Sequence, residues 1–77
     1  MATINSIHSK SIPNGTRFVA IYADGSGAGL FRIGDDGHLY NSDNEHIDSA
    51  PDYWLYAAGY GFWMELPKGF NFWGERK

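Results

Sequence analysis

The segment that most constrains the fold is a pair of β-rich runs joined by glycines. The runs span residues 17–22 and 29–33, and Asp24-Gly25-Ser26-Gly27 connects them. Asp-Gly between two such runs is typical of a hairpin, because glycine tolerates the positive φ of a tight turn. The first run has apolar side chains on both faces, which predicts a central strand. The chain is therefore expected to build an antiparallel sheet.

A second turn, residues 34–37, leads into a third strand at 38–40 and completes a meander. The polar residues 41–52 are predicted to form a loop. Ser49 is the expected N-cap of a short helix that has Pro51 in its first turn and stops before Gly59.

The last predicted strand, residues 60–66, alternates and is ended by proline. We expect Tyr60 and Phe62 on one side and Trp63 on the other. The resulting fold class is mainly β (α+β): a small twisted antiparallel sheet or half-barrel of four to five strands with one short helix.

The chain of 77 residues has room for one domain, residues 1–77, in which residues 1–12 form either an edge strand or a flexible arm. It contains no cysteine, which favours a reducing compartment. Neither a secretory signal nor a membrane-spanning run is recognisable in the sequence. We therefore expect a soluble cytoplasmic protein.

Aromatic residues are abundant. Thirteen of the 77 residues are Phe, Tyr or Trp, and nine of these lie between Tyr53 and Trp73. Each ring can bury about 150 to 250 Å², more in total than so small a core holds. Some rings are thus expected on the surface as a contact patch, or between the two subunits of a homodimer.

Acidic residues are concentrated in the same half of the chain. Between Arg32 and Lys68 there is no Lys or Arg, whereas seven of the nine acidic residues lie there. An acidic surface with aromatic anchors suits a partner protein with a basic surface, although a solvated loop region would have the same composition. The candidate contact residues are Asp35, Asp36, Asp43, Glu45 and Asp48 for charge, and Tyr53, Trp54, Tyr56 and Trp63 as anchors.

Two other binding functions are alternatives. The segment Lys68-Gly69-Phe70-Asn71-Phe72-Trp73 resembles the strand of RNA-recognition domains whose rings stack on bases. Lys68, Phe70, Phe72 and Trp73 would then bind single-stranded nucleic acid, but the net charge of −3 makes this partner unfavourable. The other alternative is a small-ligand or nucleotide binder with an aromatic pocket.

Chemistry of other kinds has little support. Asp43, Glu45, His46 and Asp48 lack the glycine and terminal glutamate of a calcium loop, and the histidines have no zinc-site spacing. No nucleophile elbow or phosphate loop is present. We therefore expect a non-enzymatic protein with no metal site and no cofactor.

The strand Trp63-Met64-Glu65-Leu66-Pro67 carries a resemblance to small uncharacterised proteins encoded by phages and prophages. Ile12-Pro13-Asn14-Gly15 and Val19-Ala20-Ile21-Tyr22, followed by Asp24-Gly25, match the earlier part of that pattern. The resemblance covers about two thirds of the chain and transfers no functional residue. It implies a small accessory protein acting in a bacterial host. Because an acidic stripe can imitate the phosphate charge of nucleic acid, we expect the chain to inhibit or modulate a host defence or nucleic-acid-handling protein.

Overall fold

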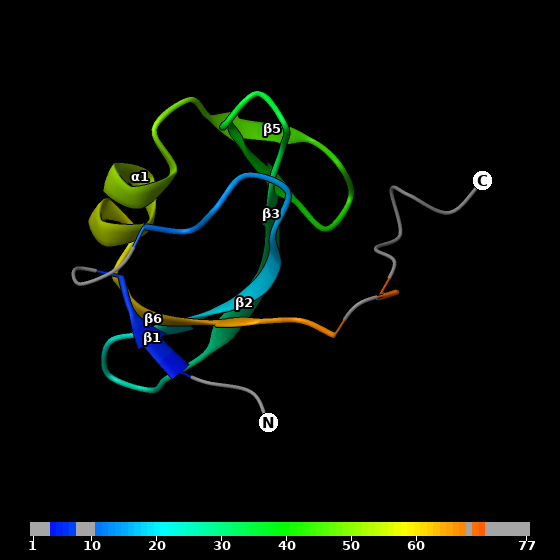
Figure 1. Ribbon diagram of the computed structural model, residues 1–77. Coiled ribbons are helices and arrows are strands. Elements are labelled where there is room, and N and C mark those ends of the chain that lie inside the picture. The colour runs from blue at the N-terminus through cyan, green and yellow to red at the C-terminus, as the bar shows by residue number, and fades with distance from the viewer. Residues whose placement is uncertain (1–3, 8–10, 68, 71–77) are drawn as a thin grey trace.

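The computed structural model describes residues 4–7, 11–67 and 69–70. In these residues six strands form one antiparallel sheet with the order β1-β6-β2-β3-β4-β5 (Figure 1). The strands are β1 (Ile4–Ser6), β2 (Arg17–Tyr22), β3 (Ala28–Ile33), β4 (Leu39–Asn41), β5 (His46–Asp48) and β6 (Tyr60–Glu65), and the helix α1 (Pro51–Ala57) lies between β5 and β6 in the chain.

The mainly β fold class is confirmed, and β2 lies in the interior of the sheet between β6 and β3. The sheet has six strands, more than the predicted four to five. Both outermost strands have only three residues. The strand β5 falls within residues 41–52, which were predicted as a loop, because three mostly polar residues give no detectable alternation.

The sheet is strongly curved. In Figure 1 it runs from β1 and β6 at the bottom to β5 at the top, and α1 lies at its open side. The concave face and the helix enclose a core in which Phe18, Leu39 and Leu55 are completely buried. None of the described residues forms a helix long and apolar enough to cross a membrane.

The β2–β3 hairpin forms as predicted. The Tyr22 amide donates to the Gly27 carbonyl at 2.9 Å, and the Gly25 amide donates to the Tyr22 carbonyl at 2.9 Å. Gly25 has a φ of 76°, which a side chain would disfavour. The Asp24 carboxylate accepts a hydrogen bond from the Ser26 amide at 2.9 Å and so closes the turn.

The start of α1 differs from the prediction. Ala50, not Ser49, is the N-cap, and its side chain cannot cap the helix. The Asp48 carboxylate instead accepts a hydrogen bond from the Ala50 amide at 2.8 Å. Proline at the first helical position needs no amide partner, which explains why this helix begins without a side-chain cap.

A β-bulge in β6 changes which side chains face the core. Trp63 pairs with Ala20 and Phe62 with Ile21, but Tyr22 then pairs with Tyr60. Gly61 is therefore an extra residue, and Tyr60 shares the concave face with Trp63. The prediction that Tyr60 and Phe62 share a face was wrong, because strict alternation cannot anticipate the inserted residue.

Candidate functional site

The four predicted aromatic anchors separate into buried and exposed pairs. Trp63 is only 3% exposed and Trp54 is half-buried against the core, whereas Tyr53 and Tyr56 are 73% and 59% exposed. Trp63 fits inside because it lies opposite Ala20, whose small side chain leaves room for an indole. Trp63 is thus a core residue, and its prediction as a surface anchor was wrong.

The concave rings pack on one another. The Tyr22 and Tyr60 rings stack with centroids 4.4 Å apart, and Phe31 meets Tyr60 edge to face at 5.5 Å. Burial, together with a hydrogen bond to Tyr22, raises the pKa of Tyr60 to about 12. Trp54 of α1 contacts both Phe31 and Tyr60, so these rings join the sheet to the helix.

The turn between β3 and β4 exposes Asp35 and Asp36. The Asp36 carboxylate accepts hydrogen bonds from the His38 amide at 3.0 Å and from the Tyr40 hydroxyl at 2.7 Å. These bonds lower the pKa of Asp36 from its ordinary value, the His38 amide having the larger effect. The two hydrogen bonds therefore fix the carboxylate in position and favour its ionised form.

The turn between β4 and β5 exposes Asp43 and Glu45. The side-chain oxygen of Asn41 accepts hydrogen bonds from the amides of both residues at 2.9 Å, and its side-chain nitrogen donates to Glu45 at 2.9 Å. Because this turn and the β3–β4 turn lie at opposite ends of β4, the predicted acidic residues flank the strand as two groups. Asp48 is half-buried in β5 and belongs to the helix start.

Arg32 lies beside these turns, a proximity that the sequence did not predict. It pairs across the sheet with Tyr40, its guanidinium lies 4.3 Å from the centre of that ring, and it donates to the Asn44 side chain at 2.9 Å. A shallow depression of about 300 Å³ is lined by Arg32, Gly34, Asp35, Asp36 and Tyr40. The register of β3 with β4, which no sequence pattern specified, creates this contact.

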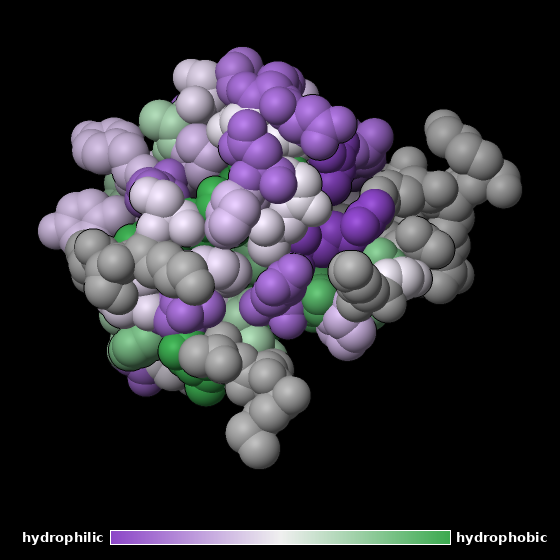
Figure 2. Space-filling model, in the orientation of Figure 1, coloured by the Kyte–Doolittle hydropathy of each residue, from purple (hydrophilic) through white to green (hydrophobic). Residues whose placement is uncertain are grey.

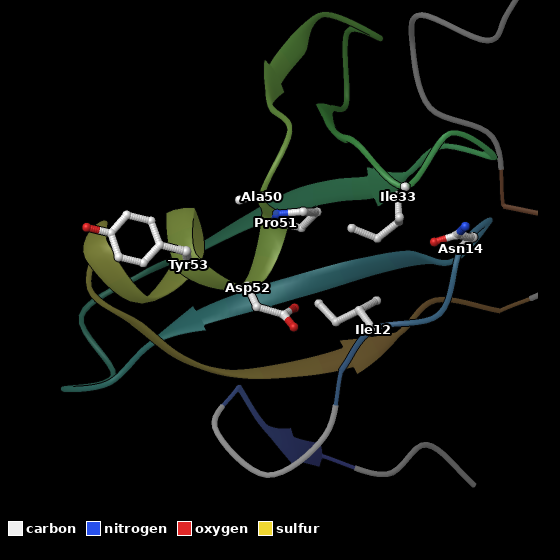
Figure 3. Close-up of a pocket in the computed structure, with 8 residues that line it drawn as sticks. Ile12, Asn14, Ile33, Ala50, Pro51, Asp52 and Tyr53 are labelled. Carbon is white, nitrogen blue, oxygen red and sulfur yellow. The ribbon is translucent and has the colours of Figure 1, made fainter.

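A pocket of about 380 Å³ connects the β3–β4 turn to the start of α1 (Figure 3). Ile12, Ile33 and Pro51 supply apolar walls, and the Asp52 carboxylate accepts a hydrogen bond from the Ser11 hydroxyl at 3.1 Å. Figure 3 shows the Tyr53 ring pointing away from the two isoleucines. The pocket is therefore not the aromatic pocket that the small-ligand alternative requires.

The nucleic-acid segment is described only in part, since Lys68, Phe72 and Trp73 lie outside the described residues. Phe70 is exposed and follows a turn in which its amide donates to the Pro67 carbonyl at 3.1 Å. Phe70 therefore lies beyond the end of β6. Among residues 4–7, 11–67 and 69–70, no three His, Asp or Glu side chains are grouped so that they could hold a metal ion.

Comparison with protein-family models, curated proteins and solved structures gave no match.

Proposed function

We propose that this chain is a non-enzymatic protein-binding module that docks on a basic surface of its partner. The observation that carries the proposal is the exposure of Asp35, Asp36, Asp43 and Glu45 on the two turns that flank β4. In Figure 2 hydrophilic side chains gather over the upper part of the molecule, where Figure 1 places β5. An acidic surface steers an encounter with a basic partner.

The exposed tyrosines of α1 supply the anchors. Tyr53 and Gly37 line the same pocket, which places the start of the helix beside the β3–β4 turn. Tyrosine buries a large area on binding and keeps a polar end, so it is enriched among residues that dominate interface affinity. The acidic turns would thus set the approach, and Tyr53 and Tyr56 would hold the complex.

The partner we propose is a bacterial host protein that itself binds nucleic acid. Such proteins present lysine and arginine to phosphate groups, and a set of fixed carboxylates can occupy the same positive surface. Hydrogen bonds hold the Asp36 and Glu45 side chains in place, so less entropy is lost when a partner binds them. The resemblance to phage and prophage proteins supports this setting.

Charge reversal on the β3–β4 turn tests the proposal. Wild type and Asp35→Lys are used as bait in a bacterial lysate, and the captured protein is titrated against each. We expect Asp35→Lys to weaken binding about tenfold, equivalent to about 1.4 kcal/mol, and to reduce its salt dependence. Tyr53→Ala should weaken binding without changing the salt dependence.

Glu65→Lys is the matched control, because it makes the same charge change on an exposed residue of β6. Equal binding by wild type and Asp35→Lys would contradict the proposal, as would equal weakening by Glu65→Lys. Salt-sensitive binding of a labelled single-stranded oligonucleotide by the wild type would favour the nucleic-acid alternative instead.

A further inference from the structure

Two histidines that are eight residues apart in the sequence lie against each other beside β4 and β5. Nδ1 of His38 and Nε2 of His46 are 3.0 Å apart, and the centres of the two rings are 5.1 Å apart. The docking surface proposed above does not use this contact. Two imidazole nitrogens that face each other are the side-chain groups most often found as metal ligands.

The pairing of the two strands creates the contact. Tyr40 pairs with His46, and the ladder then shifts by one residue, so that Leu39 pairs with Asp48. His38 immediately precedes β4, and its ring reaches the same His46 ring that Tyr40 meets edge to face at 5.5 Å. His38 is thus a diagonal neighbour of His46 across the two strands, a separation that long side chains can span.

Backbone hydrogen bonds hold both histidines in position. The Gly34 amide donates to the His38 carbonyl at 2.9 Å and closes the β3–β4 turn. The Asn41 amide donates to the Glu45 carbonyl at 3.0 Å, which fixes the start of β5 at His46. The two imidazoles therefore converge on an ordered backbone, so little further entropy is lost when they bind an ion.

The pair is open to solvent and lies in acidic surroundings. The His38 side chain is 39% exposed, and His46 is also exposed. A carboxylate oxygen of Asp36 lies 3.9 Å from Nδ1 of His38. Residues 34–48 contain five acidic residues and no lysine or arginine, and the guanidinium of Arg32 approaches from β3. The carboxylates outnumber this cation, so the surroundings favour a bound positive ion.

We propose that His38 and His46 bind one divalent transition-metal ion through these two nitrogens. Two metal–nitrogen bonds of about 2.0 to 2.1 Å place their nitrogens about 2.9 Å apart at a right angle and roughly 3.3 to 3.4 Å apart at a tetrahedral angle. The separation of 3.0 Å matches the right angle, which is typical of Cu²⁺ and Ni²⁺. Cu²⁺ should bind most tightly, because affinity for nitrogen ligands rises along the first-row series to copper.

The ion replaces the hydrogen bond between the two rings. In a neutral pair, one nitrogen donates this bond and the other accepts it. Rotation about the terminal side-chain torsion, whose energy minimum is broad, turns both nitrogens towards one ion. The donating ring moves its proton to its other nitrogen, so a neutral pair binds the metal without net loss of a proton.

The site offers two protein ligands. Within residues 4–7, 11–67 and 69–70, no third His, Asp or Glu side chain is placed to join them. Water therefore completes the coordination of the ion. Structural metal sites use four protein ligands, so we expect this ion to exchange with solvent and to be removed by a chelator.

Calorimetric titration of the full chain with CuCl₂, NiCl₂ and MgCl₂ tests the proposal. We expect one Cu²⁺ ion per chain, weaker binding of Ni²⁺ and no binding of Mg²⁺. His38→Gln and His46→Gln should each weaken Cu²⁺ binding about 10- to 100-fold, at least as much as the loss of an outer partner of a metal ligand. Electron paramagnetic resonance should show coupling of Cu²⁺ to two nitrogens in the wild type and to fewer in either variant.

Two comparisons make the test specific. His8→Gln makes the same chemical change at the third histidine of the sequence and should leave the affinity for Cu²⁺ unchanged. Because one ion uses both rings, the double variant His38→Gln/His46→Gln should lose less binding free energy than the two single losses added together. Circular dichroism establishes that each variant is folded before it is compared.

Three results would overturn the proposal: no binding of Cu²⁺ by the wild type, equal binding by the wild type and His46→Gln, or equal weakening by His8→Gln. The proposal does not rest on the proposed function, because metal binding is measured without a partner and the variants leave Asp35 and Tyr53 intact.

Discussion

The two faces of the sheet use the same strands for different purposes. On β2, Phe18 and Ala20 point to the concave face and are completely buried, whereas Val19 and Ile21 point to the convex face and are half-buried. The concave face contains aromatic rings that contact one another and the helix. The convex face contains mainly aliphatic side chains, among them Ile4, Val19 and Leu30. The comparison shows that a short chain can bury several of its rings on one face and still leave apolar side chains on the other.

The comparison is tested most strongly by removing one phenyl ring from each face. Phe18→Ala deletes a completely buried ring that contacts Phe31 and Trp63, both at 6.0 Å between ring centres. We expect it to lower the free energy of unfolding by about 3 to 5 kcal/mol. Phe62→Ala should lower it by about 1 kcal/mol or less in the monomer. Urea unfolding at low protein concentration measures both, and equal losses would contradict the assignment of the faces.

The bulge that puts Tyr60 on the concave face provides a second test. A Cβ on Gly61 would lie 2.9 Å from the Ala23 Cβ and 3.0 Å from its Cα. We therefore expect Gly61→Ala to destabilise the protein by about 1 to 3 kcal/mol in urea unfolding. Ala23→Gly removes the nearer atom, so the double variant should regain part of the loss. If Ala23→Gly alone were neutral and the double variant regained no stability, the contact between residues 61 and 23 would not be the cause of the loss.

The smallest expected effect is a pH dependence of the concave face. The pKa of Tyr60 is raised from 10.0 to about 12, so folding favours its neutral phenol. This contribution to stability is complete below the unfolded value and is lost as the pH rises from about 10 towards 12. Urea unfolding across this range should show a smaller loss of stability for Tyr60→Phe than for wild type. Tyr53→Phe, an exposed control, should lose as much stability as wild type. If Tyr60→Phe also lost as much stability as wild type, Tyr60 would not be the source of the pH dependence.

Much of the fold could be predicted because its signals are local. Asp24 and Gly25 between two β-rich runs specified the central hairpin, and the two apolar faces of β2 indicated its interior position. The bulge at Gly61 could not be predicted, because it depends on pairing with the distant strand β2. The strand β5 was missed because its three mostly polar residues show no alternation. The helix start was misplaced by one residue because Ser49 has the usual capping chemistry but lies before an Ala50–Pro51 pair.

The candidate site was less predictable than the fold. Sequence proximity grouped Asp35 and Asp36 correctly, since they share one turn. It could not show that Asp43 and Glu45 lie at the other end of β4, or that Arg32 lies against Tyr40. The sequence predicts Trp63 as an anchor because aromatic content alone does not reveal which face a ring occupies. The strand register alone shows that Ile4, Met64, Val19 and Leu30 form one apolar row on the convex face.

The shortness of β1 and β5 limits the ways in which copies of this chain can associate. An exposed strand edge is a template on which further strands can add without end, and this is how fibrils grow. In the part of the chain that the structure describes, β1 and β5 each offer only three residues to such a template. Growth along the hydrogen-bonding direction is thereby disfavoured.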